Sequence, residues 1–289
     1  MLDPMKFIFT TASDPDCARS LALAALLERD PERKVAATLA LRQAVGEEGD
    51  LALERSRTGG PHIDPLRSIV EPPDLPGRPD APVLVAPKHL VKRSVHTVIG
   101  RVVLLHALAH IEFNAINLAL DAVWRFEGMP AAYYHEWLRV AAEEAYHYSL
   151  LTAHLATLGH RYGDFPAHDG LWEMVEKTRG DVLARMALVP RTLEARGLDA
   201  APPMRARLAQ AGDEAAAAIL DIILRDEIGH VAVGNRWYRY LCAQRQLDPN
   251  AIYPSLVERY RAPKLKGPFN FEARRAAGFD ESELAALGL

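Results

Sequence analysis

Two segments of the sequence carry a glutamate followed three residues later by a histidine, Glu144-Ala-Tyr-His147 and Glu227-Ile-Gly-His230. On a helix, side chains three residues apart lie on the same face. The carboxylate and the imidazole of each motif can therefore bind one metal ion. The motif alone is weak evidence, because a chain with eleven histidines is expected to form such pairs by chance.

Three glutamates lie where a helical core should be apolar: Glu112, Glu144 and Glu227. Every residue three, four or seven positions from Glu112 is apolar, and the corresponding neighbours of Glu144 and Glu227 are apolar, aromatic, glycine or the motif histidine. An isolated buried carboxylate costs several kcal/mol even after relaxation. No Lys or Arg occupies these positions, so metal cations are the expected partners.

The order of these residues repeats along the chain. Glu112 precedes the first Glu-x-x-His motif by 32 residues, and Glu194 precedes the second by 33. One Glu from each of two helices, with Glu-x-x-His from two others, is the ligand set of dinuclear sites in four-helix bundles. Four carboxylates carry a charge of about −4, which two divalent ions would neutralise. We therefore predict six metal ligands: Glu112, Glu144, His147, Glu194, Glu227 and His230.

Glu194 fits this pattern least well, because it lies only three residues before Gly197. It reaches the depth of Glu227 only if the segment 198–212 climbs by about ten helical residues, or ~15 Å. Asp181 is a fallback ligand, and Arg191 could instead pair with Glu194 on the same helix face.

An acid also precedes each motif, Glu143 in the first and Asp226 in the second. Metal-bound imidazoles usually donate their other N–H to a carboxylate, so both acids are candidates for orienting a histidine across the bundle. A solvent-facing acid is the alternative for each. His106 and His110 lie about 200° around the helix from Glu112, so we expect them to pack or to face solvent.

Four long helices must position these residues. The periodicity predicts helices over 98–126, 130–158, 171–196 and 213–242, with a kink at Pro190, an end at Gly197 and a short piece beginning at Pro202. Residues 14–46 read as two short helices beginning with an Asp14-Pro15 cap, 59–87 as a proline-rich arm, and the tail from Asp248 as irregular with two short helices. The predicted class is all-α, a ferritin-like antiparallel four-helix bundle, with domains at 1–97, 98–242 and 243–289.

Composition excludes several other classes. The 289 residues have a net charge of −4 and two cysteines, so neither general attraction to nucleic acid or membrane nor a disulfide framework is expected. The start of the chain lacks the basic region and long apolar core of a signal peptide, and we expect a cytoplasmic protein. Residues 258–275 are basic with interleaved aromatics; they could contact RNA or a phosphorylated substrate, but a tail packed on the bundle is favoured.

The sequence resembles the ferritin-like superfamily, and more closely the bacterial domain of unknown function 455 family. The segments that carry the resemblance include LLHALAHIEFNAINLALDAVWRF, EEAYHYSLL, YGDFPAHDGLWE, RMALVPRTLEARGLD and DEIGHV, within residues 75–275. The resemblance implies a ferritin-like bundle with a non-haem di-iron or related dinuclear centre at the six residues named above. The family has no settled reaction, so the resemblance leaves the substrate open.

These observations favour an oxidoreductase that binds two Fe ions, or Mn or mixed Fe/Mn, and uses O2 to hydroxylate or oxidise a small organic substrate. The electron donor is open, and a homodimer is expected. One alternative is a ferroxidase or peroxide-detoxifying protein with the same site and no organic substrate. Another is a non-enzymatic helical binding module in which the site is structural.

Overall fold

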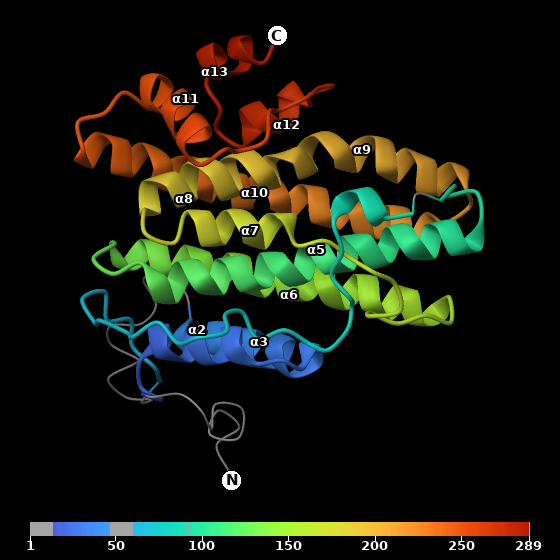
Figure 1. The fold of residues 1–289 in the computed structure, drawn as a ribbon, viewed down its shortest axis with the longest axis horizontal. Coiled ribbons are helices and arrows are strands. Elements are labelled where there is room, and N and C mark those ends of the chain that lie inside the picture. The colour runs from blue at the N-terminus through green and yellow to red at the C-terminus, as the bar shows by residue number, and fades with distance from the viewer. Residues whose placement is uncertain (1–13, 47–59, 92, 289) are drawn as a thin grey trace. The chain divides into compact units, whose positions relative to one another are not determined.

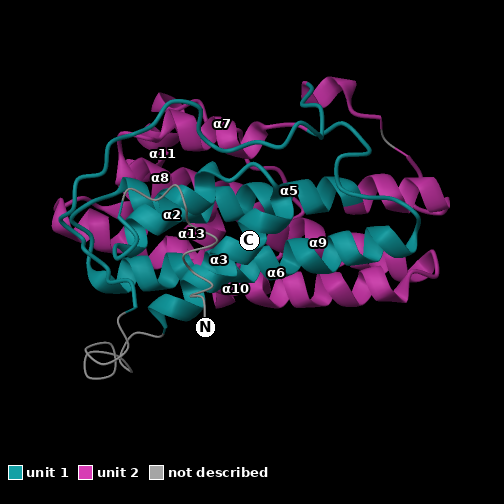
Figure 2. Ribbon diagram, turned by 90° about the horizontal axis from the view of Figure 1, so that it is seen from below, with its two compact units in different colours: residues 1–85, 106–167 teal, residues 86–105, 168–289 magenta. Residues whose placement is uncertain are grey.

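The computed structural model describes residues 14–46, 60–91 and 93–288, and no β-strand occurs among them. Long helices dominate the fold (Figure 1), which confirms the all-α class for the described part of the chain. The predictions drawn from residues 1–13 and from Gly59 lie outside it. Two compact units can be distinguished, 1–85 with 106–167 as unit 1, and 86–105 with 168–289 as unit 2 (Figure 2).

Unit 1 contains α2 (Ala18–Leu27), α3 (Pro31–Val45), most of α5 (Val98–Arg125) and α6 (Ala131–Thr157). The helix α2 begins at Ala18 with Cys17 as its cap, so the Asp14-Pro15 start was wrong. The side chain of Asp30 caps α3. Gly128, at φ +77°, lies in the short connection between α5 and α6.

Buried Arg19 of α2 fixes this helix to the end of α5. Its guanidinium donates hydrogen bonds to the carbonyls of Val123 and Trp124 on α5, and to those of Asp64, Pro65 and Arg67 in the arm. Five backbone acceptors satisfy a cation that is 1% exposed. The proline-rich arm is thus attached through its own carbonyls, without forming a helix of its own over 60–85.

Unit 2 contains η1 (Pro87–His89), the first residues of α5, and a series of helices from residue 170 onward: α7 (Gly170–Lys177), α8 (Val182–Leu188), the π-helical turn η2 (Val189–Glu194), α9 (Ala195–Gln210), α10 (Glu214–Gln244), α11 (Pro249–Arg259), α12 (Phe271–Ala276) and α13 (Glu281–Ala286). The helix α5 belongs to both units, with 98–105 in unit 2. The domain limits expected from the sequence remain predictions.

The third predicted helix, 171–196, was wrong at its middle. The chain leaves the helix after Lys177 and starts again at Val182, because Asp181 accepts a hydrogen bond from the backbone N–H of Leu183 and so caps α8. Beyond α8, Pro190 lies in a π-helical turn. The altered hydrogen-bond pattern of this turn accommodates a residue that has no backbone N–H.

The end predicted at Gly197 was also wrong, since α9 runs through Gly197 and contains Pro202 and Pro203. Pro202 has no N–H for the carbonyl of Leu198, four residues earlier. The side-chain amide of Asn270 donates to that carbonyl at 3.2 Å in its place. A residue of the tail therefore replaces a hydrogen bond that α9 cannot make.

The tail of unit 2 packs against α9 and α10. A buried cluster joins the three segments; its members are Ala195, Leu198, Val231, Ala273, Ala277, Phe279 and Leu284. Arg274 is fully buried, and it forms an ion pair with Asp199 of α9 at 2.6 Å. Arg275, also in the basic segment, pairs with Glu281 in a more exposed position.

By length and composition, α5 could cross a membrane. However, 78% of its most apolar window is buried within the described structure.

Candidate metal centre

In unit 1, Glu112 on α5 is brought to the same depth as Glu144 and His147 on α6. Glu112 lies 13 positions before Arg125, where α5 ends, and Glu144 lies 13 positions after Ala131, where α6 begins. At about 1.5 Å per residue, equal numbers of residues on either side of a short turn give equal heights. Counting residues on either side of the turn therefore explains why these side chains meet.

The three side chains form a buried cluster. His147 Nδ1 lies 3.3 Å from Glu112 Oε2 and 3.3 Å from Glu144 Oε2. The exposures of Glu112, Glu144 and His147 are 3%, 0% and 0%. One ligand atom from each lies within 4.8 Å of the others, so the group could hold a metal ion.

The pKa values of Glu112 and His147 show that this cluster requires a positive charge. Burial, reinforced by the charge of Glu144, raises the pKa of Glu112 to about 8, although hydrogen bonding to His147 acts in the other direction. Burial would lower the pKa of His147, but hydrogen bonds and charge from both carboxylates outweigh it and raise the pKa to about 11. The protonated imidazole of His147 therefore supplies positive charge between the two carboxyl groups. A bound metal cation would take over this role. Two carboxylates and an imidazole are suitable ligands for iron or manganese, so the donor set fits a divalent metal.

Unit 2 contains the second set, Glu194 at the end of η2 with Glu227 and His230 on α10. Their exposures are 8%, 7% and 0%, and His230 Nδ1 lies 3.9 Å from Glu227 Oε2. A Cβ on Gly197, one helical turn after Glu194, would lie 4.0 Å from the carboxyl carbon of Glu227. The carboxylate of Glu227 therefore faces the same turn of α9 that follows Glu194.

Glu194 can reach the depth of Glu227 along the helices because α9 is long. The helix continues for 16 residues to Gln210, and Glu227 lies 13 positions after the start of α10 at Glu214. The climb of about ten helical residues that the sequence required is present.

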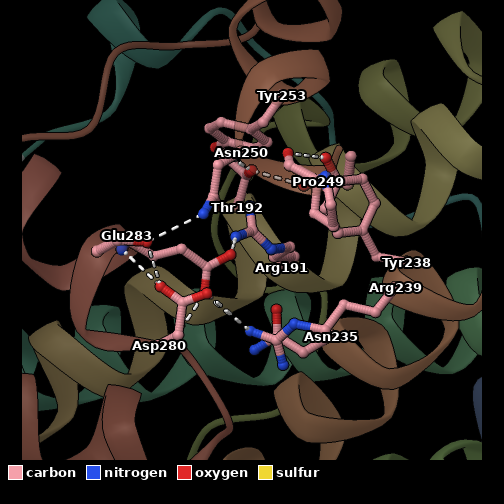
Figure 3. Close-up of polar contacts among 12 residues, drawn as sticks. Arg191, Thr192, Asn235, Tyr238, Arg239, Pro249, Asn250, Tyr253, Asp280 and Glu283 are labelled. Carbon is pink, nitrogen blue, oxygen red and sulfur yellow. Dashed lines mark hydrogen bonds and ion pairs between the residues drawn. The ribbon is translucent and has the colours of Figure 1, made fainter. Parts of the chain in front are cut away.

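The π-helical turn that bears Glu194 is held by the C-terminal tail (Figure 3). The guanidinium of Arg191 forms an ion pair with Glu283 and lies over the rings of Tyr238, Tyr253 and Phe279, 4.7–5.0 Å from their centroids. The hydroxyl groups of Thr192 and Tyr253 are hydrogen-bonded at 2.7 Å. The alternative in which Arg191 pairs with Glu194 is replaced by this contact with Glu283. No local pattern could reveal a partner 92 residues away.

The other candidate residues have different surroundings. Asp181 caps α8 and pairs with Arg245 at 3.2 Å, which gives this fallback ligand a structural role. Asp226 is half-buried and forms an ion pair with Arg225 at 2.8 Å. Glu143 is also half-buried. The role of Glu143 and Asp226 in orienting a histidine remains a prediction.

Comparisons with known proteins add the family. Residues 27–285 match the family described as "Protein of unknown function (DUF455)". An "Uncharacterized protein" of Haemophilus influenzae is 52% identical over 229 residues, which cover 77% of this chain and 80% of the relative. A search of the solved structures gave no match.

Proposed function

The chain belongs to the DUF455 family, whose description states no reaction, and from its buried carboxylate and histidine sets we propose an O2-activating oxidoreductase with a dinuclear metal centre. Two iron ions are the proposed cofactor, with manganese or a mixed pair as variants. A small organic molecule is the proposed substrate. The observation that carries the proposal is the cluster of Glu112, Glu144 and His147, in which two buried carboxylates share one imidazole.

The repeat in unit 2 supports two ions rather than one. Glu194, Glu227 and His230 have the same residue types in the same order and are buried to a similar degree. Each set would contribute two carboxylates and one imidazole, and the full set of six matches a pair of divalent ions in charge. The ferritin-like arrangement belongs to this proposal, with α5, α6, the continuous α8–η2–α9 segment and α10 as its four helices.

The protein's part in this chemistry is to bind, to orient and to exclude water. When bound, the metal pair would supply the electrons and open coordination positions that O2 reduction needs. Overall, hydroxylation of a substrate C–H bond by O2 consumes two protons and two electrons and releases one water; the two electrons come from an external donor that would re-reduce the metal pair. The buried side chains around Glu144, among them Trp137, Val140 and Leu151, keep bulk water from the carboxylates.

The proposal is tested by anaerobic Fe(II) loading of the full-length protein, removal of unbound iron, and addition of O2 while the absorption spectrum is recorded. We expect retained iron and a new absorption band that depends on O2. Glu144→Gln should lose both, whereas Glu127→Gln, which changes an exposed glutamate of unit 1, should keep both. A wild-type protein that retains iron but gives no spectral change with O2 would overturn the redox function and leave a structural metal site.

A ferroxidase would give the same band without an organic substrate. Continued O2 consumption driven by Fe(II) alone, with mineralised iron in a large cage, would replace the proposed reaction with iron oxidation. A dimer without mineral favours the proposed oxidoreductase.

A further inference from the structure

Three basic side chains of unit 2 have no partner in the part of the chain that the structure describes. Arg261, Lys264 and Lys266 lie in the connection between α11 and α12 (Figure 1), and all three are exposed. Their side chains form no hydrogen bond or ion pair with any described residue. No acidic residue occurs from 259 to 271. The connection therefore carries three positive charges that nothing beside them in the sequence neutralises.

The other arginines of the basic segment 258–275 are engaged elsewhere. Arg274 and Arg275 form ion pairs with carboxylates, at 2.6 Å in each case. The guanidinium of Arg259 lies over the ring of Tyr260, 5.4 Å from its centroid. The structure thus divides the basic segment into residues that serve the fold and three that face solvent.

Both ends of this connection are fixed to unit 2. At its start, the N–H of Ala262 donates to the carbonyl of Val257 at 2.9 Å, and Arg261 has a φ of +51°. This arrangement ends α11 and turns the chain away from the helix. At its end, the backbone N–H and the side-chain amide of Asn270 donate to α9, at 2.9 and 3.2 Å. The cations therefore belong to a loop whose two ends are held in place.

The surroundings of the cations disfavour a membrane or another protein as the partner. Residues 259–270 expose no large hydrophobic side chain. Stable binding to a membrane surface needs inserted apolar groups in addition to charge, and protein interfaces have an apolar or aromatic centre. A nucleic acid, in contrast, is bound largely through its phosphates by Lys and Arg. The loop therefore fits a nucleic acid best.

Arg261 favours a single strand over a duplex. Its guanidinium is planar, and no carboxylate among the described residues holds it. Bases of single strands can lie on such a plane, whereas the bases of a duplex are stacked on one another. We propose that the loop 261–266 binds single-stranded nucleic acid, with phosphates on Lys264 and Lys266 and a base against the guanidinium of Arg261.

The test is fluorescence anisotropy of a labelled oligouridylate of about ten nucleotides, titrated with the full-length protein. At about 20 mM KCl we expect a dissociation constant of about 100 µM or tighter. Raising the KCl concentration about tenfold should weaken binding by about 25-fold, because each of the two phosphate contacts contributes about −0.7 to the slope of log K against log salt. A duplex of the same length and a decaglutamate peptide should each bind at least about threefold more weakly, because neither offers an unstacked base to Arg261.

Three variants separate the two kinds of contact. Lys264→Gln/Lys266→Gln removes both phosphate contacts, so the same rise in KCl should weaken binding by less than about threefold. Lys88→Gln/Lys177→Gln makes the same change of charge at exposed lysines outside the loop and should keep the wild-type salt dependence. Arg261→Lys keeps the charge but loses the plane, so its affinity should fall at least about threefold with the salt dependence unchanged.

Five results would overturn the proposal. These are no binding at low salt, equal binding of the duplex or the peptide, equal binding of vesicles that contain anionic phospholipid, an unchanged salt dependence in Lys264→Gln/Lys266→Gln, and an unchanged affinity in Arg261→Lys. Thermal unfolding of each variant shows whether it is folded. All the substituted positions are exposed, so we expect the wild-type midpoint in each.

Discussion

The two units present the same set of residue types, Glu and Glu-x-x-His, on different scaffolds. In unit 1 the residues lie on the uninterrupted helices α5 and α6, and His147 is 3.3 Å from both carboxylates. In unit 2 Glu194 ends a π-helical turn that contains a proline, and His230 is 3.9 Å from Glu227. Regular helices are enough to assemble the first set. The second also depends on whatever stabilises the irregular turn.

The buried cations differ in the same way. Arg19 and Lys34 of unit 1 donate mainly to neutral acceptors, namely backbone carbonyls and one side-chain amide. Arg191 and Arg274 of unit 2 form ion pairs with carboxylates, Arg191 with Glu283 in the tail and Arg274 with Asp199 in α9. The tail of unit 2 thus acts as a clamp on η2 and α9, and a defect there should reach Glu194 while unit 1 keeps its cluster.

The largest expected effect on stability comes from breaking that clamp. Arg191→Leu leaves Glu283 near Arg239 but removes a buried charge pair and three ring contacts. Breaking a buried pair by removing one partner costs about 3–5 kcal/mol. Urea unfolding should show this loss, whereas Arg275→Gln, which breaks an exposed pair, should cost less than about 1 kcal/mol. Equal stability of the two variants would show that the tail does not clamp η2.

The next effect concerns the space that η2 requires. A Cβ on Gly234 of α10 would lie 2.6 Å from Cβ and Cγ of Pro190, so Gly234→Ala should push the π-helical turn away and cost about 1–3 kcal/mol. A Cβ on Gly229, on the same helix, meets nothing within 4 Å. Gly229→Ala should therefore be stabilising by about 0.5–1 kcal/mol. Thermal unfolding of the pair is the measurement, and a neutral Gly234→Ala would contradict the close approach.

Two acids test whether the units are alike beyond the predicted ligands. If Glu143 and Asp226 orient metal-bound histidines, Glu143→Gln and Asp226→Asn should each weaken Fe(II) affinity by about 10–100-fold. Competition with a coloured chelator measures this, with Glu258→Gln, at an exposed glutamate, as the control. Fe(II) affinities equal to that of the control would show that both acids face solvent and do not orient a histidine. A loss in only one variant would show that the two sets are supported differently.

A pH-dependent effect on stability is also expected, and it belongs to unit 1. The pKa of Lys34 falls from 10.5 to about 7 on folding, mainly because of burial. Between these values the unfolded chain holds a proton that the folded chain lacks, so the free energy of unfolding should rise with pH by up to about 1.4 kcal/mol per unit. Lys34→Met should lack this contribution when denaturant unfolding is followed from pH 7 to 9. Parallel wild-type and variant curves would contradict the lowered pKa.

The sequence predicted the regular part of the molecule well and the irregular part poorly. The register of Glu112 against Glu144 follows from counting residues on either side of Gly128, because both helices are continuous. The helix ends at Lys177 and at Gln210 could not be derived in this way. Gly197 and Pro202 are local signals for an end, but Asn270, far along the chain, supplies the hydrogen bond that lets α9 continue.

The candidate site shows the same division. All six predicted ligands are buried, and the apolar spacing around Glu112, Glu144 and Glu227 was sufficient to identify their helix faces. The clamp by Arg191 and the hydrogen bond from Lys34 to Asn117 were missed, because each depends on side chains brought together by tertiary contacts. Spacing within one helix identifies the residues that share a face. It does not identify the distant segment that packs against that face.

The central proposal is a dinuclear centre held by the six predicted ligands, and the iron content of loaded protein tests it most directly. Wild-type protein loaded anaerobically and freed of unbound Fe(II) should retain about two irons per chain. Glu144→Gln and Glu227→Gln should each retain fewer than about one, because the proposed dinuclear centre needs all six ligands to hold both ions. Less than one iron in the folded wild-type protein, or full retention in either variant, would contradict it.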